Sequence, residues 1–152
     1  MSDFPSIALA ADHGGFRLKQ AVLAWLRAEA YAVTDFGTDG SASVDYPDYA
    51  HPACAAVLAG KAQFGVLICG TGLGMSIAAN RHPGIRCAML NESASARLTR
   101  AHNNANVAAL GGRMIAEEAA FDILRVFLTT QYDGGRHDAR LAKLSPSLKE
   151  PA

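Results

Sequence analysis

The segment FGVLICGTGLG, residues 64–74, decides the fold class of this chain. Its first six residues, Phe64 to Cys69, form a continuous apolar run rather than an alternating one, which is typical of a strand buried on both faces of a parallel sheet. The glycines that follow predict a tight turn, and a helix is expected from about Met75 to Asn80. The sequence therefore predicts a strand near the centre of a sheet, followed by a loop and a helix.

The same alternation extends outward along the chain. Further strands are expected at residues 6–10, 32–36, 85–90 and 107–110. Helices are expected at residues 18–26, 49–59, 92–101, 115–129 and 136–144, and the longest loop of the first half at 38–47. Strands that alternate with helices at short intervals specify a parallel sheet with helices on both faces. We therefore expect an α/β fold, a Rossmann-like three-layer α/β/α sandwich with a five-stranded parallel sheet.

Length and composition favour one domain over residues 1–152, with a C-terminal helix at about 136–144 and a short frayed tail. Fourteen basic and fourteen acidic side chains cancel, which argues against nucleic acid or an anionic membrane as the main partner. No secretory leader or membrane-spanning stretch is visible, and three cysteines without a C-x-x-C pair favour a reducing compartment. We expect a cytoplasmic protein without disulfides or a structural metal.

Ligands of open parallel sheets bind beyond the carboxyl ends of the strands, and the residues at these positions are polar here. They are Asp12 and His13 after the first strand, Cys69 with the glycine loop after the third, and Gly111, Gly112 and Arg113 after the fifth. His102 and Asn103 lie between the fourth helix and the fifth strand. His51 and His82 are interpreted as ordinary surface or helix-end residues.

The glycine loop can serve either as a structural turn or as an anion site built from main-chain N–H groups and a helix N-terminus. It lacks the lysine of a phosphate loop and does not match G-x-G-x-x-G, which weakens a nucleotide-binding interpretation. Cys69 tilts the balance toward function, because a thiolate at the loop can act as nucleophile or base. A cysteine phosphatase would need arginine where Met75 stands. The alternative for Cys69 is a buried apolar role, as expected for Cys54 and Cys87.

Arg136 and Arg140 are four residues apart, so a helix would place both guanidinium groups on one face, where they could grip a phosphate. The alternative is a solvated basic face. His137 would be a third donor, although it points elsewhere if the helix begins at Arg136.

Several motifs together resemble the type B ribose-5-phosphate isomerase family over nearly the whole chain. These motifs are Ala11-Asp12-His13-Gly14-Gly15, Asp45-Tyr46-Pro47, Ile68-Cys69-Gly70-Thr71-Gly72-Leu73-Gly74, Ile77-Ala78-Ala79-Asn80, His102-Asn103-Asn104-Ala105-Asn106-Val107 and Gly134-Gly135-Arg136-His137. The family also includes galactose-6-phosphate isomerase subunits and isomerases of other phosphorylated aldoses, so the motifs specify the reaction class better than the substrate.

The resemblance implies an aldose-ketose isomerase in which Cys69 moves a proton from C2 to C1 of the open-chain sugar through a cis-enediolate. One branch of the family uses a glutamate at the position of Met75 instead. By the same matching, His102 opens the furanose ring, Asp12 and Thr71 assist at the sugar hydroxyls, and Asn103 contacts the sugar. The implied binding residues are the main chain of Gly70, Gly72, Leu73 and Gly74 for the enediolate, and His13, Arg113, Arg136 and Arg140 for the phosphate.

The resemblance also implies a homodimer or a dimer of dimers in which the His102 region crosses to the neighbour's Cys69. Neither a metal nor a cofactor is expected. Two departures bear on substrate choice: Ser93-Ala94 stands where many relatives have Pro-Tyr, and Asn104 where aspartate is common. The same chemistry on a six-carbon or four-carbon sugar phosphate therefore stays open, as does a non-catalytic sugar-phosphate or nucleotide sensor, although an intact acid, base and anion hole argue against a sensor.

Overall fold

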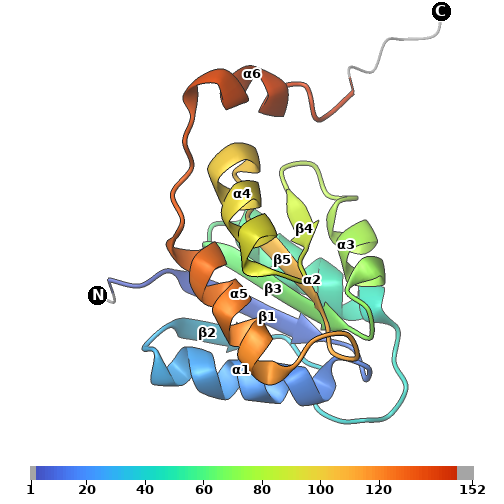
Figure 1. Ribbon diagram of the computed structural model, residues 1–152. Helices are drawn as coiled ribbons and strands as arrows, with labels where there is room; N and C mark the ends of the chain where they lie inside the picture. The colour runs from blue at the N-terminus through green and yellow to red at the C-terminus, as the bar shows by residue number, and fades with distance from the viewer. Residues whose placement is uncertain (1–2, 147–152) are drawn as a thin grey trace, which may run out of the picture.

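The computed structural model describes residues 3–146, and their strands form one parallel sheet (Figure 1). The strands are β1 (Ser6–Ala11), β2 (Ala32–Asp35), β3 (Phe64–Cys69), β4 (Cys87–Met89) and β5 (Val107–Gly111). Their order across the sheet is β2-β1-β3-β5-β4, so β3 lies at the centre. The predicted five-stranded parallel sheet, with the apolar run of residues 64–69 in the middle, is confirmed.

Helices cover both faces of the sheet. They are α1 (Phe16–Ala28), α2 (Tyr46–Leu58), α3 (Leu73–Ala79), α4 (Ser93–Asn103), α5 (Glu117–Thr129) and α6 (Asp138–Leu141). Helices α1, α4 and α5 pack on one face and α2 and α3 on the other, whereas α6 stands apart from the sheet (Figure 1). This arrangement is the predicted three-layer α/β/α sandwich. No helix in the described part of the chain is long and apolar enough to cross a bilayer.

The two faces of the sheet are packed with side chains of different size. Under α1, α4 and α5 the buried side chains are large, and they include Leu26, Leu124 and Phe127. Under α2 and α3 the core is rich in alanine, for example Ala10 and Ala53. Large apolar side chains each contribute about 1.5–3 kcal/mol when fully buried, so the first face supplies more of the stability. The alanine layer instead allows α2 to lie close to the sheet.

The predicted starts of α2 and α3 differ from the structure. Helix α2 begins at Tyr46 rather than at residue 49, because Pro47 occupies the first turn, where its missing N–H costs no hydrogen bond. Helix α3 begins at Leu73 rather than at residue 75, since Gly72 adopts the left-handed conformation (φ +81°) directly before it. The shift of α2 also shortens the predicted loop at 38–47.

The predicted C-terminal helix at 136–144 is wrong in its extent. The chain makes a 3-10 turn at Gly135–His137 and a four-residue helix, α6, in which no residue is buried. Short helices without a packed face are marginal in water, which explains why the helix does not continue to residue 144. The predicted fraying of the tail falls largely on residues 147–152, which lie outside the described residues.

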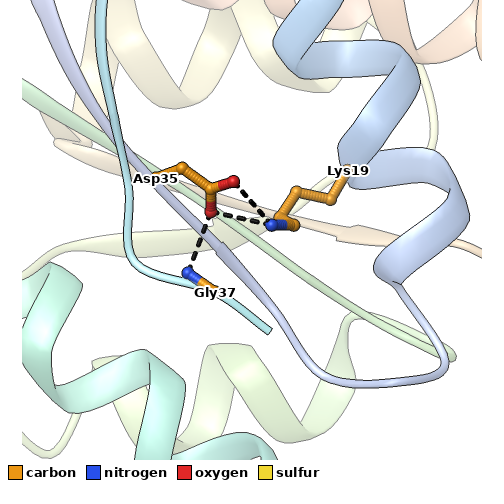
Figure 2. A network of polar contacts seen from close by, with 3 residues as sticks. All are labelled: Lys19, Asp35 and Gly37. Carbon is orange, nitrogen blue, oxygen red and sulfur yellow. Dashed lines mark hydrogen bonds and ion pairs between the residues drawn. The ribbon is translucent and has the colours of Figure 1, made fainter. Parts of the chain in front are cut away.

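A buried lysine joins α1 to the end of β2 (Figure 2). Lys19 is 1% exposed, and its Nζ donates hydrogen bonds to both carboxylate oxygens of Asp35, at 2.7 and 2.8 Å. Asp35 Oδ1 also accepts from the main-chain N–H of Gly37 at 2.9 Å. Gly37 in turn accepts through its carbonyl oxygen from the N–H of Ala11, at 2.7 Å. The ion pair therefore fixes the loop after β2 against the carboxyl end of β1.

Candidate active site

The loops after β1, β3 and β5 meet at one edge of the sheet, because carboxyl ends of neighbouring parallel strands lie side by side. This edge collects most of the predicted site residues of one chain: Asp12, His13, Cys69, Gly70, Thr71, Gly72, Leu73, Gly74 and Arg113. We call it the thiol edge.

Cys69 is the last residue of β3 and is 4% exposed. Its Sγ accepts a hydrogen bond from the main-chain N–H of Gly72 at 3.1 Å. The pairing of β3 with β5 continues beyond the strands, because Gly112 N–H donates to the Cys69 carbonyl at 2.8 Å and Arg113 N–H donates to the Gly70 carbonyl at 3.0 Å. These bonds fix the glycine loop and the sulfur relative to Arg113.

Close approaches explain why the loop needs glycine. A Cβ on Gly70 would lie 3.1 Å from Nη1 of Arg113, so the guanidinium rests against the loop. A Cβ on Gly74 would lie 2.7 Å from Cζ of Tyr46. In the sequence, Tyr46 is named only as part of a motif, and no role is predicted for it. In the structure, its ring borders the glycine loop. Its place near the end of the longest predicted loop, residues 38–47, was the available signal.

Asp12 and His13 are held by the main chain. Asp12 is buried, and its Oδ1 accepts from Gly15 N–H at 3.1 Å. His13 Nδ1 accepts from the main-chain N–H of Val44 at 3.2 Å, so the ring carries its proton on Nε2. Thr71 is exposed, and its Oγ1 accepts from Leu73 N–H at 3.2 Å. Each of these side chains thus has a defined orientation before any ligand arrives.

His102 lies elsewhere, in the last turn of α4. Its ring stacks on that of His137, with centroids 4.4 Å apart and planes at 17°, and Asp133 Oδ2 lies 4.0 Å from its Nε2. Burial lowers the pKa of His137, and His102, Arg136 and Arg140 lower it further. The ligating atoms of His102, Asp133 and His137 lie within 4.8 Å of one another, but the two neighbouring guanidinium groups oppose a bound cation.

The structure does not bring His102 to Cys69 within one chain. Residue 102 precedes β5, whereas Cys69 pairs with Gly111 at the end of β5. The strand between these levels, from Val107 to Gly111, spans about 13 Å. The edge opposite the thiol edge, which we call the imidazole edge, holds the remaining predicted residues: His102, Asn103, Arg136 and Arg140.

Two histidines interpreted as ordinary surface residues contact each other. His51 Nδ1 lies 2.7 Å from His82 Nε2, and this hydrogen bond joins α2 to the turn after α3. The two are 31 positions apart, and the sequence carries no local signal for the contact. The stacking of His137 on His102 was missed for the same reason.

Comparisons with known proteins identify the family of this chain. The family model described as Ribose/Galactose Isomerase matches residues 7–144. Ribose-5-phosphate isomerase B of Escherichia coli is 45% identical over 139 residues, covering 91% of this chain and 93% of that protein. D-erythrulose-4-phosphate isomerase of Pectobacterium atrosepticum is 39% identical over 140 residues, covering 91% and 92%.

A solved structure is also similar to this chain. The crystal structure of a ribose 5-phosphate isomerase from Thermotoga maritima superposes with a TM-score of 0.91 at 51% sequence identity, covering 91% of this chain and 96% of that one. The residues that the family model matches include β2 to β5, β1 except for Ser6, and the thiol edge. The chain therefore belongs to the ribose/galactose isomerase family.

Proposed function

We propose that this sugar-phosphate isomerase interconverts ribose 5-phosphate and ribulose 5-phosphate through a cis-enediolate. The observation that carries the proposal is the sulfur of Cys69, which lies beside main-chain donors of the glycine loop and accepts from Gly72 N–H at 3.1 Å. A proton next to a carbonyl becomes removable only where negative charge on the oxygen is stabilised as it develops. In the proposed site, the base, Cys69, is adjacent in sequence to the glycine loop that would form the anion hole.

In the proposed reaction, the Cys69 thiolate takes the proton from C2 of the open-chain aldose and returns it to C1. The N–H groups of Gly70 to Gly74 hold the negative oxygen of the enediolate, and Asp12 and Thr71 help to move the hydroxyl proton from O2 to O1. His13 and Arg113 face the phosphate. These roles agree with the orientations set by Gly15, Val44 and the β3–β5 pairing.

The proposal requires a second copy of the chain. His102 donates a proton to the ring oxygen, yet it lies on the imidazole edge, at the far end of β5 from Cys69. We infer that the imidazole edge of one copy faces the thiol edge of another, in a homodimer or a dimer of dimers. Asn103 would then contact the sugar and Arg136 and Arg140 the phosphate, across the interface.

The proposal is tested with the purified protein in EDTA. Wild type should interconvert the two pentose phosphates, and Cys69→Ala should lower kcat by about a thousandfold or more, because the base is lost. Cys54→Ala is the matched control, since this thiol lies in the core and burial raises its pKa to about 11. Near-normal turnover by a folded Cys69→Ala protein would contradict the mechanism.

A second candidate substrate rests on the relative that isomerises erythrulose 4-phosphate and on Ser93-Ala94, which begin α4 at the carboxyl end of β4. Side chains shorter than Pro-Tyr at these positions would change the shape of the substrate pocket but not the reaction. Comparing kcat/KM for four-, five- and six-carbon sugar phosphates separates the candidates. A tenfold or larger preference (about 1.4 kcal/mol) for a sugar other than ribose 5-phosphate would reassign the substrate but keep the mechanism.

A further inference from the structure

Arg100 is a buried cation whose hydrogen bonds are incomplete. It lies on α4, is 8% exposed, and uses Nη1 alone as a donor, to Asn104 Oδ1 at 3.0 Å and to the Ala105 carbonyl at 2.6 Å. Its Nε is buried without a partner, and its Nη2 donates to no group within residues 3–146. Nη2 is therefore the guanidinium nitrogen that is left for a ligand, whereas Nε is unpaired but shielded from solvent.

The surroundings of Arg100 contain no balancing charge. Its guanidinium carbon lies 4.8 Å from the ring centroid of Phe64 and 5.8 Å from that of Phe127, and these rings offer cation–π contacts but no negative charge. Burial and the nearby Arg86 both lower the pKa of Arg100. In residues 3–146 no carboxylate forms an ion pair with it. An unpaired buried charge costs several kcal/mol, so this arrangement calls for an anion.

The side chain that receives the Nη1 bond is uncharged. Asn104 ends α4 in the left-handed conformation (φ +45°), which asparagine and aspartate tolerate better than most residues. A carboxylate there would lie 3.0 Å from Arg100 and would supply the missing counter-ion from within the chain. In this protein the same charge must come from outside.

A pocket opens beside the guanidinium. It has a volume of about 330 Å³ and is lined by Arg100 together with polar residues from three segments, among them Gln63, Thr130 and Gln131. The two glutamine amides can donate to an oxygen anion. Asp3, also in the wall, is exposed and makes no ion pair with Arg100 in the described chain.

We propose that this pocket binds a small oxyanion or carboxylate at Nη2 of Arg100. A guanidinium N–H donates a strong, charge-assisted hydrogen bond to an oxygen of a phosphate, sulfate or carboxylate group, and the amides of Gln63 and Gln131 can bind its other oxygens. The site is separate from Cys69, because Phe64 begins the strand that Cys69 ends. It does not depend on the proposed isomerase reaction.

The test follows the Nε–H resonance of Arg100 by NMR in the full-length protein, titrated with inorganic phosphate or with acetate while sodium chloride keeps the ionic strength constant. The resonance, assigned by its loss in Arg100→Lys, should shift and saturate. Phosphate bound elsewhere does not move it, since the signal reports on one guanidinium. Saturation by phosphate alone identifies an oxyanion site, and saturation by both probes identifies a general carboxylate and oxyanion site.

Asn104→Asp is the decisive variant, because it changes one atom and supplies an internal counter-ion. It should weaken the response by about tenfold or more. Arg125→Gln is the control, since Arg125 is exposed, stacks on Trp25 and already pairs with Asp122 at 3.0 Å, so the response should persist. A resonance that neither probe moves in wild type, or an equal response in Asn104→Asp, would overturn the proposal.

Discussion

Gly15 shows how closely one residue can tie the thiol edge to the sheet. A Cβ at this position would lie 2.3 Å from the carbonyl oxygen of Ile68, a backbone atom that cannot move aside. Gly15→Ala should therefore reduce the free energy of unfolding by about 3 kcal/mol or more, which is in the range of the largest overpacking effects. Urea unfolding measures the change.

Gly40→Ala is the matched control for this prediction. Nothing lies within 4 Å of a Cβ at Gly40, and its φ does not demand glycine, so the substitution should be neutral or slightly stabilising. Equal effects of the two substitutions would show that the contact with Ile68 is unimportant.

At the same scale, sequence could predict Cys69, the glycine loop and Arg113, because these residues directly follow strands and one rule about parallel sheets places them together. It could not predict which atoms hold them. The bond from Val44 to His13 and the contact of Tyr46 with Gly74 depend on the path of a long loop. Such contacts carry no periodicity, so only the structure reveals them.

At the scale of elements, the strands were predictable because apolar runs mark them, whereas Lys19 was not. A hydrophobic pattern assigns a lysine to the solvent side of a helix, yet Lys19 is buried and paired with Asp35. The pairing partner is 16 positions away, on another element. The predicted helix boundaries were wrong where local conformation sets the end of a helix. Examples are the start of α2 at Pro47 and the extent of the unpacked helix α6.

The ion pair leads to an asymmetric prediction. Asp35→Asn should cost about 3 kcal/mol, because it leaves a buried ammonium unpaired, whereas Lys19→Met should cost less, since Asp35 is 27% exposed and keeps its bond from Gly37. The double variant should be more stable than the two single effects added together predict. Denaturant unfolding of the three variants checks this. A larger loss for Lys19→Met than for Asp35→Asn would contradict the expected asymmetry.

At the scale of the whole molecule, the separation of the two edges predicts that inactive variants rescue each other. Cys69→Ala and His102→Asn change opposite edges. When the two are unfolded, mixed and refolded together, half of the dimers are hybrids with one intact site, so activity should return to about a quarter of wild type.

The matched control mixes Cys69→Ala with Arg113→Met. Both changes lie on the thiol edge, so every site in every hybrid is damaged and no activity should return. Rescue in both mixtures, or in neither, would rule out a site shared between copies.

The alanine layer under α2 sets how close this helix lies to the sheet. Because methyl groups such as those of Ala10 and Ala53 set the spacing between α2 and the sheet, they also set the height of Tyr46, which opens that helix and leans on Gly74. Adding a carbon or two to Ala10 or Ala53 would therefore shift Tyr46 relative to the glycine loop. The position of a side chain that borders the candidate site is thus set by alanines buried between α2 and the sheet.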